Sequence, residues 1–154
     1  MAAVYKISDD FYEDSFALIA LHSSLEDHSL VYALNHCLKA NLKRSKSDLD
    51  ISEDVSFPLF EWKDIDSDSY WTLVTNLSIV TGDLRPGGLF ENEPSFTKSY
   101  LVPEFKEVDY FLKVEQGSEE LRSKALKSIL SIPRVVTAYT IDNKKLKSKN
   151  NLIF

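Results

Sequence analysis

The residues best suited to chemistry lie close together in one short segment, Leu101–Leu112. The segment holds two carboxylates, Glu104 and Asp109, and the phenol of Tyr110 follows the second of them directly. Two carboxylates on either side of a substrate can carry out general acid–base catalysis. On a continuous strand, however, Glu104 and Tyr110 share one face and Asp109 lies on the other, because side chains alternate along a strand. These groups therefore do not converge, and the segment predicts no catalytic residue.

The surroundings of Glu104 decide what this residue does. On such a strand its carboxylate points toward the core, where an ionised group is costly unless it is paired or hydrogen-bonded. A bulge at Pro103, which cannot donate a ladder hydrogen bond, would turn Glu104 outward. Alternatively the carboxylate meets Arg85, Arg134 or backbone N–H groups. A structural contact fits, and so does a binding or catalytic role for Glu104. The candidate binding residues of this region are Arg85, Pro103, Glu104, Asp109 and Tyr110.

The same segment resembles the signature of the IPExxxVDY family, a small, uncharacterised bacterial family. Val102 stands at the first motif position in place of Ile, and the remaining positions are matched by Pro103, Glu104, Val108, Asp109 and Tyr110. The chain length, a helix containing Ala33-Leu34-Asn35 and the closing residues 151–154 extend the resemblance over essentially the whole chain. It implies no activity, cofactor or catalytic residue. It also implies that the gene often lies near those of ribonuclease III and pyruvate kinase.

A second set of candidate binding residues is basic. The chain has a formal charge of -6, but residues 47–69 alone hold eight acidic residues and one lysine. Two basic clusters lie outside that segment, one of Lys39, Lys43, Arg44 and Lys46 and one of Lys144, Lys145, Lys147 and Lys149. If the clusters lie side by side, they form a patch that attracts RNA, a phosphate ligand or an acidic partner. The alternative is a solvated helix end and a flexible tail.

No metal ion or cofactor is predicted. His28, His36 and Cys37 are possible metal ligands by type, as is His22. On the expected helix, however, His36 and Cys37 are neighbours that point about 100° apart, and His28 lies two turns away. Cys37 is expected to be a small buried hydrophobe. Residues 85–88 lack the glycine spacing of phosphate-binding and dinucleotide-binding loops.

The elements that position these residues follow from the hydrophobic pattern. The unbroken apolar run Phe16–Leu21 predicts a central strand covered on both faces. A helix follows, with Ser23 or Ser24 as its N-cap and with apolar residues at spacings of three and four. A second helix is expected at 119–132, ended by Pro133, before a last strand at 135–141. The inward face of the first helix consists of Leu30 or Val31, Leu34, Cys37 or Leu38, and Leu42.

The middle of the chain predicts strands and one long loop. Strands are expected at 49–51, 57–63, 70–80 and 100–115. The second and third of these form an antiparallel hairpin, and the last is interrupted at Pro103. Residues 81–98 contain three of the four glycines and are expected to form an irregular loop.

The element order predicts an α+β fold. We expect a two-layer sandwich in which two helices lie on one face of a mostly antiparallel sheet of about five strands, with a ferredoxin-like core. A chain of 154 residues is sufficient for one domain, so residues 1–154 are expected to form it. Residues 1–13 would be an N-terminal extension and 143–154 a basic C-terminal tail.

The composition and the lack of a predicted membrane segment or secretion signal favour a globular cytoplasmic protein. A hydrophobic content of 44% excludes a disordered or collagen-like chain. The single cysteine precludes an internal disulfide. The longest apolar run has six residues, whereas a membrane-spanning helix needs about 20, so no membrane segment and no secretion signal are predicted.

The sequence leaves three functional hypotheses. The first is a non-catalytic binding or regulatory domain with an unknown protein partner, and a homodimer fits this hypothesis as well. The second is an RNA-associated accessory protein that binds through the lysine and arginine clusters. The third is a small enzyme of unknown reaction built around Glu104, Asp109 or the 81–98 loop.

Overall fold

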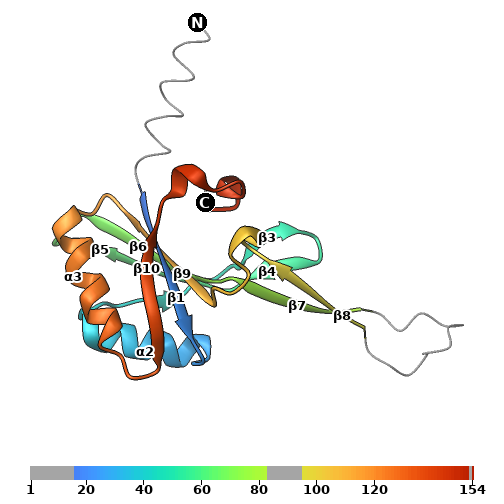
Figure 1. Ribbon diagram of the computed structural model, residues 1–154, viewed down its shortest axis with the longest axis horizontal. Coiled ribbons are helices and arrows are strands. Elements are labelled where there is room, and N and C mark those ends of the chain that lie inside the picture. Colours follow the sequence, from blue (N-terminus) through green and yellow to red (C-terminus); the bar gives the residue numbers. More distant parts are fainter. Residues whose placement is uncertain (1–15, 83–94, 153) are drawn as a thin grey trace, which may run out of the picture.

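The computed structural model describes residues 16–82, 95–152 and 154 (Figure 1). Its centre is a six-stranded antiparallel sheet with the strand order β10-β1-β9-β6-β5-β2. The sheet strands are β1 (Phe16–Ser23), β2 (Lys43–Arg44), β5 (Leu59–Asp64), β6 (Ser69–Thr75), β9 (Tyr110–Glu115) and β10 (Val135–Ile141). The helices are α2 (Asp27–Leu38) and α3 (Glu119–Leu130). The α+β class and the mostly antiparallel sheet are therefore confirmed, whereas the ferredoxin-like core stays a prediction.

Strand β1 is the central strand that its apolar run predicts. It pairs with β10 on one side and β9 on the other, and Phe16–Leu21 are buried throughout. Both sheet faces of β1 are covered, which explains why its sequence lacks the polar alternation of a half-exposed strand.

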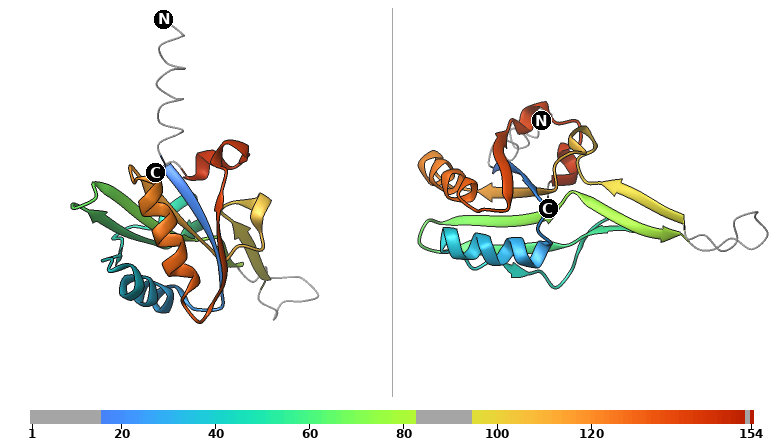
Figure 2. Two further views of the ribbon diagram at one scale, coloured as in Figure 1. Left: turned by 60° about the vertical axis from the view of Figure 1, so that its left-hand side comes forward. Right: turned by 60° about the horizontal axis from the view of Figure 1, so that its bottom comes forward.

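Both helices pack on one face of the sheet (Figure 2). Leu34 of α2 and Ile129 of α3 are fully buried against inward-facing residues of β1, β6 and β9. Helix α3 begins with Ser118, whose Oγ accepts a hydrogen bond from the Leu121 N–H at 3.1 Å. Helix α2 has Glu26 as its N-cap residue, with no side-chain cap hydrogen bond, so the expected serine cap is wrong. Ser23 instead donates its hydroxyl to the Arg134 carbonyl, joining β1 to the turn before β10.

The opposite face is covered by irregular chain and by residues of the 49–57 hairpin. Leu101, Val102 and Val108 come from one segment, and Leu146 and Leu152 come from the C-terminal segment. The short 3-10 helices η2 (Asn143–Lys145) and η3 (Lys149–Leu152) carry that C-terminal segment across the sheet. The alternative of a flexible basic tail is therefore wrong for the described residues, because Leu146 and Leu152 belong to a hydrophobic core.

Two small hairpins project from the main sheet (Figures 1 and 2). One pairs β3 (Leu49–Ser52) with β4 (Val55–Phe57), and the other pairs β7 (Leu77–Gly82) with β8 (Ser95–Tyr100). The β7–β8 ribbon corrects the predicted 81–98 loop, since strands occupy both ends of that range; residues 83–94 lie outside the described residues. The strand predicted at 49–51 exists, but it pairs with β4 and not with the edge of the main sheet.

Two predicted strands are each divided in the structure. The 70–80 strand splits at Asn76 into β6 and β7. The 100–115 strand splits into β8, the 3-10 helix η1 (Pro103–Phe105) and β9. Both breaks occur where the chain leaves one sheet for another.

Asn76 holds the two breaks together. It is fully buried and makes five hydrogen bonds, all to residues between Leu101 and Asp109. Its Nδ2 donates to the Phe105 carbonyl at 2.8 Å and to the Val108 carbonyl at 2.9 Å. Its Oδ1 accepts from the Val102 N–H at 2.9 Å. The side chain thus replaces the ladder that the irregular segment lacks.

The two described α-helices have twelve residues each. Within the described residues, no helix combines the length and the apolar character needed to cross a membrane.

We expect Asn76→Ala to destabilise the protein by about 3 kcal/mol, because it leaves the Val102 N–H and the Val108 carbonyl without partners in a buried site and removes one of the two hydrogen bonds of the Phe105 carbonyl. Urea denaturation followed by tryptophan fluorescence measures this change. The exposed Asn150→Ala is the matched control and should shift the free energy of unfolding by less than about 0.5 kcal/mol. Equal effects of the two substitutions would contradict the role assigned to Asn76.

Candidate functional site

The structure places Glu104 on the surface, in η1, and not in the core. Its Oε2 accepts the backbone N–H groups of Lys147 at 3.0 Å and Ser148 at 3.1 Å, and its Oε1 accepts the Ser148 hydroxyl. The inward-facing Glu104 expected for a continuous strand is wrong, because Pro103 begins a 3-10 turn that interrupts the alternation. Of the partners considered, backbone N–H groups are the ones found. Glu104 therefore fastens the C-terminal segment to the body, and Pro103 begins the turn that presents it.

These contacts also set the acidity of Glu104. Partial desolvation raises its pKa, but the hydrogen bonds from the Ser148 side chain and from the backbone outweigh that effect and hold the pKa below its ordinary value. The charged carboxylate is thus the form that binds the C-terminal segment.

Asp109 and Tyr110 hold a different pair of segments. The Asp109 Oδ2 accepts the Ser23 N–H at 2.8 Å, and the Tyr110 hydroxyl donates to the Leu25 carbonyl at 2.6 Å. Both contacts fix the connection between β1 and α2. Burial, together with the charges of Asp27, Asp109 and Glu26, raises the pKa of Tyr110 to about 12.

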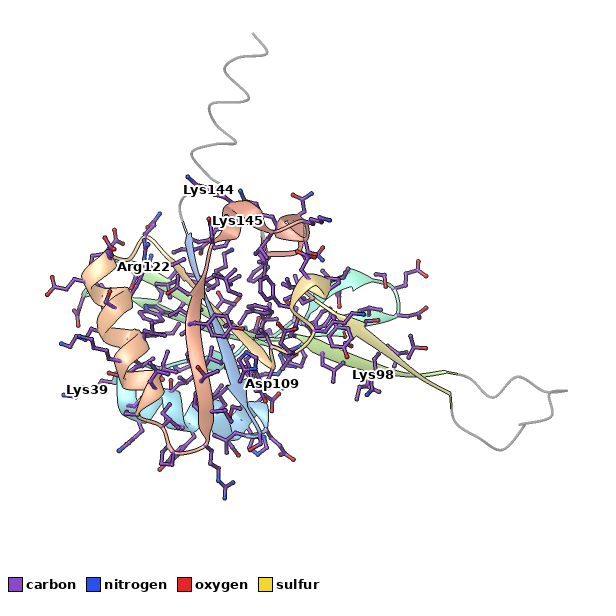
Figure 3. The ribbon with its side chains drawn as sticks, viewed as in Figure 1. Lys39, Lys98, Asp109, Arg122, Lys144 and Lys145 are labelled. Atoms are coloured by element: carbon purple, nitrogen blue, oxygen red, sulfur yellow. The ribbon has the colours of Figure 1, made fainter. Side chains whose placement is uncertain are left out.

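Asp109 and Tyr110 line the same cleft, although strand alternation predicts opposite faces. Asp109 precedes β9, so the alternation does not extend to it. The cleft has a volume of about 460 Å³. We call it the ribbon-base cleft, and its lining residues are Ser23, Ser24, Leu25, Glu26, Thr75, Leu77, Tyr100, Lys106, Val108, Asp109 and Tyr110. In Figure 3, Asp109 lies where the body meets the ribbon, and Lys98 lies farther out along β8.

The charges of the ribbon-base cleft are predominantly negative. Glu26 and Asp109 contribute carboxylates, and Lys106 is the only basic residue among the lining residues. The Lys106 ammonium lies 5.6 Å from the centre of the Tyr100 ring, in a cation–π contact. The cleft thus favours a ligand group that donates hydrogen bonds or carries positive charge.

An exposed apolar stripe extends from this cleft along the ribbon. Leu77 and Ile79 are 38% and 54% exposed, and they pair in register with Tyr100 and Lys98 respectively. These four residues lie on one face of the ribbon because residues paired across strands, and residues two apart, share a face. Leu77 and Tyr100 also line the cleft, so the stripe and the cleft form one continuous surface.

The first basic cluster is dispersed in the structure. Arg44 hydrogen-bonds Asp48 and the Leu59 carbonyl and lies over the Phe60 ring. Lys43, in β2, and Lys46 are exposed, whereas Lys39 lines a separate cavity beside the helices. Figure 3 shows Lys39 at one edge of the helical layer and Lys144 and Lys145 near the C-terminal segment, so these members of the two clusters are not side by side. Arg85 lies outside the described residues.

The histidines and the cysteine have separate surroundings. His22 Nε2 lies 2.9 Å from the Tyr139 hydroxyl, and His28 lies beside the carboxylates of Glu26 and Asp27. Burial raises the pKa of the Cys37 thiol, which is opposite to the activation that a nucleophilic thiolate needs. Among the described residues, no three histidine, cysteine, aspartate or glutamate side chains gather closely enough to hold a metal ion.

Two structural features escape the sequence patterns. The first is Asn76, whose signal in the sequence is its residue type, because asparagine is depleted in strands. Lys113 is 2% exposed in β9, with its ammonium 3.2 Å from Glu115 and 4.9 and 4.3 Å from the ring centres of Phe16 and Phe154. Nothing in the sequence distinguishes this buried lysine from the outward-facing lysine of an ordinary half-exposed strand.

None of the protein-family models, curated proteins or solved structures compared with the chain matches it.

We expect Glu104→Gln to weaken the docking of the C-terminal segment and to destabilise the protein by about 1 kcal/mol at neutral pH, allowing for solvent screening. Because the folded-state pKa is lowered, the stabilisation by wild-type Glu104 is present above its ordinary value of 4.5 and is lost as the pH falls through the folded-state pKa. The amide proton shifts of Lys147 and Ser148 should follow this titration in nuclear magnetic resonance spectra.

The control for this experiment is Glu107→Gln, at an exposed position three residues away. It should preserve the acid titration of the Lys147 and Ser148 amides, whereas Glu104→Gln abolishes it. If the titration persists in Glu104→Gln, the carboxylate does not bind the C-terminal segment.

Proposed function

We propose that this chain is a non-catalytic protein-binding domain whose partner docks on the β7–β8 ribbon and in the ribbon-base cleft. The observation that carries the proposal is the stripe of Leu77 and Ile79, which is exposed on a projecting ribbon and leads directly into the cleft. Apolar side chains exposed together beside a cleft are typical of surfaces that bind other proteins.

The shape of the surface favours a protein segment over a small metabolite. The stripe runs along the ribbon and away from the body. An extended chain can follow the stripe, whereas a compact molecule cannot. A two-stranded ribbon also offers backbone N–H and C=O groups at its edges for pairing with an added strand. The carboxylates of Glu26 and Asp109 at the end of the stripe suit a lysine, an arginine or another donor side chain of the partner.

The chemistry of the cleft supports binding in place of catalysis. A tyrosine with a pKa of about 12 stays protonated at neutral pH, so Tyr110 does not accept a proton there. Its hydroxyl and the Asp109 carboxylate both make hydrogen bonds to the β1–α2 connection. These groups shape the wall of the cleft.

Membership of the IPExxxVDY family forms part of the proposal. The motif residues Glu104, Asp109 and Tyr110 each hold a segment that is distant in sequence, and two of them line the cleft. A motif whose residues make such contacts suits a binding surface better than a catalytic site.

Affinity capture from a lysate of cells that contain the protein, with quantitative mass spectrometry, tests the proposal. We expect Ile79→Glu to lower recovery of a specific partner at least about tenfold, because it places a charge in the centre of the docking surface. Val136→Glu is the matched control: Val136 is 81% exposed on β10, and its substitution should leave recovery unchanged.

Circular dichroism should show that both variants fold. Equal recovery of every captured protein by wild type and Ile79→Glu would overturn the proposal. A wild-type chain that captures only itself would replace the proposed partner with a second copy.

A further inference from the structure

A second cavity lies between the helices and the sheet, and it shares no lining residue with the ribbon-base cleft. Its volume is about 280 Å³. We call it the tryptophan pocket, because both tryptophans of the chain line it. Its other lining residues are Cys37, Leu38, Lys39, Asp64, Leu121, Lys124, Ala125 and Ser128.

The indole rings form the aromatic wall of this pocket. Trp62 and Trp71 are paired across β5 and β6, with ring centres 5.8 Å apart and an interplanar angle of 35°. Trp71 is almost completely buried, and its indole N–H donates to the Ser69 hydroxyl at 2.8 Å, which fixes the ring. Trp62 is half-buried and packs beside it. A polarisable indole ring of this kind stacks well with a planar ring.

Two exposed lysines line the pocket beside the aromatic wall. Lys39 follows α2, and Lys124 lies on α3. Within the part of the chain that the structure describes, neither lysine has a carboxylate within ion-pair distance. The Asp64 carboxylate accepts hydrogen bonds from the Asp66 N–H at 3.1 Å and the Ser67 hydroxyl at 2.5 Å, so its own loop engages both oxygens. The charged lining residues sum to a net positive charge.

The backbone of Lys39 adds a further observation. Its φ of 53° is left-handed, and glycine or asparagine is the usual residue at this helix-terminal position. A lysine there costs about 1 kcal/mol relative to an unstrained backbone. This conformation ends α2, and the Lys39 N–H donates to the Asn35 carbonyl there.

We propose that the tryptophan pocket binds a small planar aromatic carboxylate. The ring stacks on the Trp62 wall, and the carboxylate lies at the lysine ammonium groups. A volume at the lower limit of ligand pockets, about 300 Å³, suits one ring or a fused pair of rings. This site is independent of the protein-binding surface, and either proposal can fail without the other.

Nuclear magnetic resonance titration with 1-naphthoate tests the site directly, because the protein has only two indole N–H signals and both report on the pocket. We expect both signals to shift saturably. The neutral 1-naphthalenemethanol should bind at least about tenfold more weakly, since it offers no charge to the lysines.

Three variants identify the contacts. Lys39→Gly removes the ammonium and relieves the left-handed backbone, so it should weaken binding about tenfold without loss of stability. Lys124→Ala should weaken it by a similar factor. Lys63→Ala is the matched control, because Lys63 follows Trp62 on β5 and its side chain is on the opposite face of the sheet.

Two results would overturn this proposal. One is equal affinity for the carboxylate and the alcohol, which would reduce the pocket to an unspecific apolar groove. The other is unchanged binding in both Lys39→Gly and Lys124→Ala, which would remove the lysines from the site.

Discussion

The buried amide of Asn76 is the interaction on which the rest of the structure depends. Both of its side-chain N–H groups and its carbonyl oxygen bind backbone groups of one irregular segment, between Val102 and Val108. That segment covers one face of the sheet, starts β9 and ends the β7–β8 ribbon. Because this irregular backbone satisfies only some of its own polar groups, burying it requires such a donor and acceptor set. The ribbon can therefore leave the body at a fixed position.

The polar residues of the motif, Glu104, Asp109 and Tyr110, also hold separate segments of the chain together. Glu104 binds a segment 43 and 44 residues later, while Asp109 and Tyr110 bind a segment about 85 residues earlier. Each contact joins chain ends that no helix or strand ladder connects. The residue types best suited to chemistry thus hold segments of the fold together, and the surfaces that we propose for binding are the ribbon stripe, the ribbon-base cleft and the tryptophan pocket.

The sequence pattern predicts the regular elements well and the breaks poorly. The apolar run of β1 and the helical spacing of α2 and α3 are local signals, and these elements are confirmed. The break at Asn76 escapes because Leu73, Leu77 and Ile79 keep one parity through it. For the same reason Glu104 is wrongly predicted to face the core, since alternation carries no information about a 3-10 turn. Asp109 and Tyr110 line the same cleft because such a break comes just before β9. Only the three-dimensional path of the chain reveals that break.

The buried lysine of β9 has a consequence for how the strands align. Phe111, Leu112 and Val114 are buried, so apolar side chains of β9 face both sides of the sheet and alone would define its pairing weakly. A shift of one residue would move the Lys113 ammonium, together with Glu115 of the same strand, away from the rings of Phe16 and Phe154 and into the apolar layer beneath the helices. Taking the ammonium from its two aromatic contacts into that apolar layer costs free energy. A single cation thus selects one registry for the strand that joins both halves of the sheet.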